Sequence, residues 1–112
     1  MTPVLARSQE VPLGKLTYDS TLVANFDDRM LAHLQVVIGA KFRRGESCQM
    51  SWVTDHAEGS GRNVIWLDPA IPLGFKYDSA RAPLLNRAWI EALMTTADSA
   101  GGLRIVPEPP EN

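Results

Sequence analysis

The stretch FDDRMLAHLQVVIGAKFRRG, residues 26–45, carries the strongest helix pattern in the chain. Asp27 or Asp28 can accept backbone N–H groups at its start, and the basic residues of its last turn complement the negative end of the helix dipole. Gly45 can adopt the left-handed conformation that ends a helix. At about 100° per residue, one apolar stripe forms and predicts the core-facing side. The stripe consists of Leu31, Leu34, Ile38 and Phe42, widened by Met30 and Val37.

Length and composition limit the possible classes of protein. A chain of 112 residues with 45% hydrophobic content predicts one compact domain with its own core. Its 11 basic and 13 acidic residues give a net charge of -2, which excludes a global attraction to nucleic acid or to an anionic membrane. We expect no membrane partner and no cofactor, because no long apolar segment and no cysteine-based zinc motif is present. The single Cys48 fits a reducing, cytoplasmic location.

Alternating apolar and polar residues predict strands on both sides of the first helix. A turn at Asp19 and Ser20 joins the first two strands, and residues 55–61 suit a hairpin connection. A second helix begins near Pro83 or Asn86, and the pattern leaves both starts open. The predicted strands are 14–18, 21–26, 47–54, 62–67, 73–78 and 103–106.

The predicted element order is β-β-α-β-β-β-α-β, with a mainly antiparallel sheet and two helices on one face. This arrangement is a two-layer α+β sandwich. Residues 14–106 form the single domain, residues 1–13 an N-terminal extension and residues 107–112 an exposed, proline-rich tail. The predicted core comprises Leu16, Phe26, Leu31, Leu34, Ile38, Trp52, Phe75, Trp89 and Leu93.

The side of the first helix opposite its apolar stripe is less polar than a solvated face. Glycine at position 39 lowers helix stability by ~1 kcal/mol relative to alanine, and close approach of another backbone is one compensation. Two interpretations stay open: a small-residue surface, or a contact with a second copy or a partner helix. The candidate interface residues are Ala32, Val36, Gly39, Ala40, Arg29 and His33.

A local basic patch is the alternative binding surface, although the helix dipole alone explains basic residues in the last turn. Trp52 and Trp66 could stack on bases if they faced solvent, but their strand spacing favours packing in the core. The candidate nucleic-acid-binding residues are Lys41, Arg43, Arg44 and Arg62.

No motif specifies catalysis, and we assign no catalytic residue and no metal ligand. His56 lies in a loop whose spacing fits a solvated hairpin tip. Residues 59–62 lack the GxxxxGK[ST] pattern that cradles phosphate. We expect Cys48 to be a buried small hydrophobe.

Several blocks spread over residues 14–109 resemble a family of small, uncharacterised actinobacterial proteins, a domain of unknown function. Members begin near the position of Gly14, which implies that residues 1–13 are an extension. Some relatives carry the name ATP-dependent DNA ligase. The matching blocks are GKLTYDS (14–20), FDDRMLAHLQVVIGAKFRRGES (26–47), SGR and IWLDPAIPL (60–73), NRAWIEAL (86–93) and GGLRIVPEP (101–109).

Ligase chemistry uses a lysine, usually in K-x-D-G, which becomes adenylated, together with carboxylates for metal ions. The nearest match, KYDS at residues 76–79, ends in serine rather than glycine. We therefore predict a non-catalytic binding or protein-interaction module that self-associates. A nucleic-acid-associated accessory protein is the alternative, and a ligase-type enzyme is the least favoured function.

Overall fold

The computed structural model describes residues 12–56 and 59–111. The predicted N-terminal extension, apart from its last two residues, and the tip of the loop after His56 lie outside these ranges. The order of helices and strands is the predicted one. The elements are β1 (Leu13–Tyr18), β2 (Leu22–Asp27), α2 (Asp28–Arg43), β3 (Cys48–His56), β4 (Gly59–Leu67), β5 (Leu73–Lys76), α3 (Arg87–Ala97) and β6 (Leu103–Arg104).

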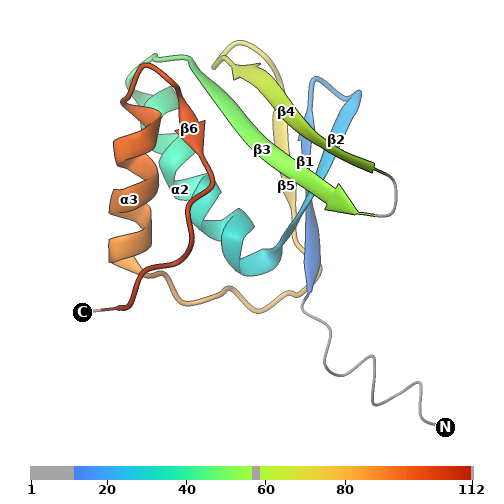
Figure 1. The fold of residues 1–112 in the computed structure, drawn as a ribbon, viewed down its shortest axis with the longest axis vertical. Coiled ribbons are helices and arrows are strands. Elements are labelled where there is room, and N and C mark those ends of the chain that lie inside the picture. Colours follow the sequence, from blue (N-terminus) through green and yellow to red (C-terminus); the bar gives the residue numbers. More distant parts are fainter. Residues whose placement is uncertain (1–11, 57–58, 112) are drawn as a thin grey trace, which may run out of the picture.

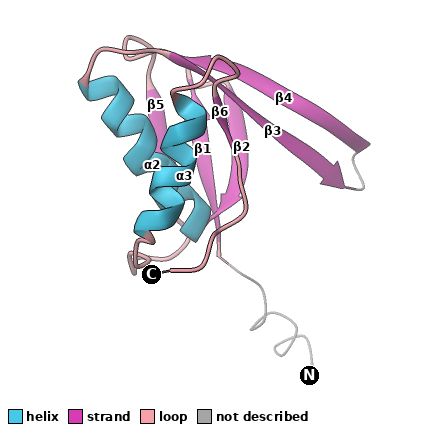
Figure 2. Ribbon diagram, turned by 60° about the vertical axis from the view of Figure 1, so that its left-hand side comes forward, coloured by secondary structure: helices cyan, strands magenta, loops and turns pink. Residues whose placement is uncertain are grey.

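Within the described residues, six strands form two three-stranded sheets, with orders β2-β1-β5 and β4-β3-β6. Every pair is antiparallel except β3 with β6. The predicted α+β class and antiparallel character are confirmed, while the strands divide between two sheets instead of one. Pro69 and Pro72 separate β4 from β5, and proline cannot donate to a strand ladder. In Figure 1 the hairpin of β3 and β4 crosses in front of β1 and β2, and Figure 2 shows the same hairpin projecting away from the other strands. Both figures show the two helices together on one side.

Both aspartates at the start of α2 are used, for different purposes. Asp27 is the N-cap, and its Oδ1 accepts the N–H of Met30 at 2.8 Å. The carboxylate of Asp28 is buried and accepts the backbone N–H groups of Asp78 and Ser79 at 3.1 and 2.9 Å. Gly45 ends the helix with φ of +71°, as predicted. Asp28 thereby ties the start of α2 to the chain that follows β5.

Asn86 caps α3, which decides between the two starts that the sequence left open. Its Oδ1 accepts the N–H groups of Ala88 and Trp89 at 3.0 and 3.4 Å. The Asn86 side chain is only 1% exposed. A buried cap fixes the position of α3 against its neighbours as well as its first residue.

The core lies between the helices and the strands. Leu16 pairs in register with Ala24 on β2 and Phe75 on β5, which places it at the centre of its sheet. Six predicted core residues are buried: Leu16, Leu31, Leu34, Ile38, Trp89 and Leu93. Three others, Phe26, Trp52 and Phe75, are partly buried against that core. Three strand residues outside the predicted core, Met50, Leu67 and Leu103, are also fully buried.

Two further predictions about β3 and β4 have opposite outcomes. Cys48 is a free, buried cysteine that is 5% exposed, as expected for a small hydrophobe. Trp66 is 63% exposed, so its predicted packing in the core is wrong. Alternation in β4 turns its neighbour Leu67 inward, and the side chain of Trp66 therefore points outward.

Candidate groove between the two sheets

A groove of about 1240 Å³ separates the two sheets. All six residues of β2 line one wall, and residues 51–54 of β3 line the wall opposite. The segment that follows β6, residues 105–107, closes a third side. The structure thus brings the edge of one sheet close to the other sheet without pairing them.

The edge of β2 is open. Within the described chain, β2 pairs with β1 alone. An edge strand presents unpaired N–H and C=O groups, and natural proteins commonly protect it with proline or lysine. The β2 sequence LVANFD contains neither residue. The β2 edge therefore carries neither of these two protections.

Apolar groups connect and flank the two walls. Phe26 on β2 meets Trp52 on β3 edge to face, with ring centroids 5.6 Å apart. Val23 and Val53, one on each wall, are 53% and 68% exposed. Leu13 at the end of the groove is 54% exposed. The groove therefore combines backbone hydrogen-bonding groups with apolar surface.

The six interface candidates on α2 differ in how exposed they are. Ala32, Val36, Gly39 and Ala40 are half-buried, and the side chain of Arg29 is 38% exposed. His33, predicted as a surface or interface residue, is instead fully buried within the chain. Its ring packs on Trp89 of α3 with centroids 4.6 Å apart, which means that this part of the helix faces α3 within the same chain.

Two backbone groups hold the His33 ring in one orientation and one tautomer. Nδ1 lies 2.7 Å from the carbonyl oxygen of Arg29 and donates to it. Nε2 accepts the backbone N–H of Asn86 at 2.8 Å. A ring with these partners carries its proton on Nδ1. His33 therefore acts as a buried link between α2 and the cap of α3.

Glu108 completes this polar cluster. Its carboxylate accepts hydrogen bonds from Nε and NH2 of Arg29 and from Nδ2 of Asn86. The hydrogen bond from Arg29, and then that from Asn86, lower the pKa of Glu108 to about 2. Sequence reasoning missed Glu108 because its partners are distant in the chain.

The four basic candidates do not form one patch. Lys41 is buried, and its Nζ contacts Asp98 and Glu46 at 3.0 Å each. The hydrogen bond to Asp98 is the largest cause that raises the pKa of Lys41, and the hydrogen bond to Glu46 is the next. Arg44 lies 3.7 Å from the same Glu46. Burial removes Lys41 from the surface that the nucleic-acid prediction required.

Arg43 and Arg62 are the two exposed basic candidates without a carboxylate partner among the described residues. Arg43 is the last residue of α2, and Arg62 lies near the start of β4. Figures 1 and 2 both show these ends of the two elements on opposite sides of the molecule. The two charges therefore cannot contact one short nucleic-acid segment together.

One family model matches the chain. The family described as Domain of unknown function (DUF7882) covers residues 13–108. The chain belongs to this family. The match extends over β1 to β6 and includes Glu108 near its end. No curated protein and no solved structure matches the chain.

Within the described part of this DUF7882 chain, no three His, Cys, Asp or Glu side chains gather as a metal site. The loop tip at residues 57 and 58, next to His56, lies outside that part. Lys76 of the KYDS segment is exposed at the end of β5. Among the described helices, none is both long and apolar enough to cross a bilayer.

Proposed function

We propose that this chain is a non-catalytic protein-interaction module that self-associates through the open edge of β2. The observation that carries the proposal is an unprotected edge strand whose six residues all line a large groove. Main-chain hydrogen bonds give affinity in strand addition, and alternate side chains give specificity. A cytoplasmic location is part of the same proposal, because the only cysteine is free and buried.

The residues of β2 suit pairing with a second β2. In a two-fold antiparallel pair centred on Ala24, Leu22 of one copy lies opposite Phe26 of the other. The same register puts the acidic Asp27 of each copy at opposite ends of the pair, so the two charges do not meet. Such pairing is isologous and closed, which favours a dimer over a filament. The β2-β1-β5 sheets of the two copies would then join into one six-stranded sheet.

The choice of β2 over the predicted helix face follows from what α2 already contacts. His33 packs against α3 inside the chain. An added Cβ at Gly39 would meet only Arg43 NH1, at 3.8 Å, so the described chain brings no other backbone close to this glycine. The helix face therefore offers a weaker reason for association than the unpaired strand edge beside it.

Sedimentation equilibrium over a range of protein concentrations tests the proposal. We expect a monomer–dimer equilibrium that Val23→Lys shifts toward monomer, because a lysine on an edge strand opposes pairing. Val64→Lys is the matched control, since Val64 is also an exposed strand valine but does not line the groove. A strict monomer, or a dimer insensitive to Val23→Lys, would overturn the proposal.

Nucleic-acid association is a second candidate function, and one observation favours it. Arg62, Val64 and Trp66 alternate along one face of β4, so the exposed indole of Trp66, a possible stacking surface, shares that face with the positive charge of Arg62. Binding of a labelled single-stranded oligonucleotide at low salt, measured by anisotropy, should weaken with Arg62→Glu and Trp66→Ala. Absence of binding at low salt would remove this candidate.

A ligase-type enzyme stays the least favoured alternative. Incubation with ATP and Mg²⁺, followed by intact-mass analysis, would reveal an AMP adduct that disappears in Lys76→Ala. We expect no adduct in either protein. An adduct on Lys76 would contradict a non-catalytic function.

A further inference from the structure

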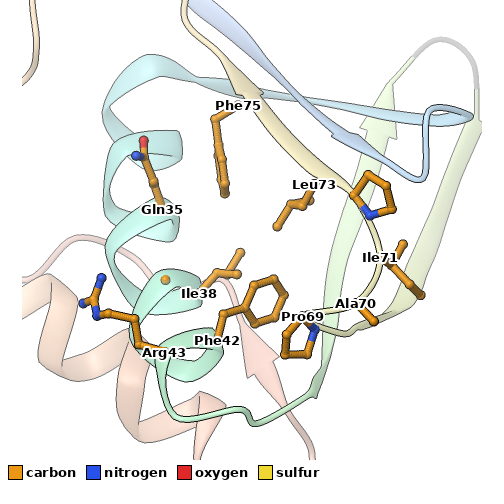
Figure 3. Close-up of a pocket in the computed structure, with 11 residues that line it drawn as sticks. Gln35, Ile38, Phe42, Arg43, Pro69, Ala70, Ile71, Leu73 and Phe75 are labelled. Carbon is orange, nitrogen blue, oxygen red and sulfur yellow. The ribbon is translucent and has the colours of Figure 1, made fainter.

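A second hollow, of about 450 Å³, lies between α2 and the chain that joins β4 to β5. Figure 3 shows Phe42 and Phe75 on two sides of it, with Leu73 between them and Ile38 near the helix. Pro69 and Ile71 of the connecting chain also line the hollow. Its volume falls within the range of small-molecule pockets, and its lining combines aromatic and aliphatic side chains with polar surface.

The rim on the α2 side is formed by Gln35, Gly39 and Arg43, at steps of four residues. This spacing places all three on one side of the helix. A Cβ at Gly39 would have only Arg43 within 4 Å. Packing thus does not require glycine here, although glycine is unfavourable inside a helix. Because Gly39 has no side chain, the space between Gln35 and Arg43 stays open.

Two hydrogen-bond donors at this rim have no acceptor among the residues that the structure describes. Gln35 accepts the hydroxyl of Tyr77 at 2.5 Å through Oε1, which leaves its amide NH₂ as a donor. Arg43 is exposed and has no carboxylate partner among the described residues. The nearby carboxylate of Glu46 already contacts Lys41 and Arg44. Arg43 therefore places an unpaired positive charge at the rim.

We propose that this pocket binds a small monocarboxylate with an aromatic body. The aromatic ring would lie between Phe42 and Phe75, where ring pairs add to the gain from apolar burial. The carboxylate would accept hydrogen bonds from the guanidinium of Arg43 and the amide of Gln35, and bonds to Arg are charge-assisted. This site is separate from the β2 edge and does not depend on self-association.

Titration with 3-phenylpropionate, followed by ¹H–¹⁵N NMR, tests this assignment. We expect saturable shifts of the amides at Gln35, Gly39 and Arg43. The neutral 3-phenylpropionamide has nearly the same shape and should bind about tenfold more weakly, since it lacks the charge that Arg43 recognises. Equal affinity for the two compounds, or no saturable shift with the acid, would overturn the proposal.

Four variants test the location of the site. Arg43→Gln should weaken binding of the acid about tenfold, whereas Arg62→Gln, at the other end of the molecule, should leave it unchanged. Gly39→Trp should abolish binding by placing an indole over the rim, with circular dichroism confirming that the variant is folded. Equal losses in the two arginine variants would show only non-specific attraction and overturn the proposal. Val23→Lys should retain binding, which separates this result from that of the proposed dimer.

Discussion

Arg29 and Glu108 are 79 residues apart in the chain and form a two-pronged ion pair. Arg29 Nε donates to Oε1 at 2.9 Å, and NH2 donates to Oε2 at 2.6 Å. Asn86 Nδ2 donates to the same carboxylate and to the carbonyl of Pro109. The chain after residue 106 is mostly exposed, but these contacts fasten it to α2 and to the cap of α3.

The Glu108 carboxylate predicts a specific acid dependence of stability. Its pKa falls from 4.5 to about 2 in the folded chain, with the Arg29 hydrogen bond as the largest cause. The contribution of the pair is therefore fully present above pH 4.5 and is lost as the pH falls from there toward 2. We expect the stability advantage of wild type over Glu108→Gln to shrink across that interval.

Urea unfolding of both proteins at several pH values measures this difference. Above pH 4.5 the difference should be constant, because Glu108 stays ionised in the folded and the unfolded chain. Other acidic groups titrate in both proteins and largely cancel. A difference that does not change below pH 4.5 would contradict the ion pair in solution.

Asn86 combines a helix cap with two donors toward the end of the chain. Asn86→Ala should lower the free energy of unfolding by about 1–2 kcal/mol through the lost cap alone. Asn86→Ser keeps a capping oxygen but lacks the Nδ2 donor to Glu108, so its loss should be smaller. Urea unfolding ranks the variants. If serine were as damaging as alanine, the amide contacts would outweigh the cap.

Substitution by alanine should change the free energy of unfolding in opposite directions at two glycines. At Gly14, an added Cβ would lie 2.7 Å from the carbonyl oxygen of Lys76 and 2.8 Å from Leu31 Cδ2. Gly14→Ala should lower the free energy of unfolding by about 1–3 kcal/mol through overpacking. Gly39→Ala should raise it by about 1 kcal/mol, because alanine favours the helix and the space is open. Thermal and urea unfolding measure both, and a destabilised Gly39→Ala would show hidden packing at α2.

The thiol of Cys48 should react slowly in the folded chain. Burial raises its pKa, and the reactive species is the thiolate. Ellman's reagent should therefore modify Cys48 mainly after unfolding in urea. Exposed Ser47, changed to cysteine in a Cys48→Ala background, is the matched control and should react at once. Equal rates in the two folded proteins would contradict the burial of Cys48.

The sequence by itself determined the features that depend on neighbours in the chain. The apolar stripe of α2, the left-handed Gly45 and the turn at Asp19 and Ser20, both with positive φ, follow from local spacing and residue type. The fold class also follows, because the periods of helices and strands differ. Buried Cys48 was predictable from strand alternation.

Only the tertiary structure decided which edges and faces meet. Alternation in β4 shows that two faces exist, but long-range pairing chose the outward face for Trp66. The inward position of His33 depends on α3, and the role of Glu108 depends on Arg29. Strand pairing and polar contacts between distant residues leave no periodic signal in either segment. The division into two sheets, and hence the open edge of β2, arises from such contacts.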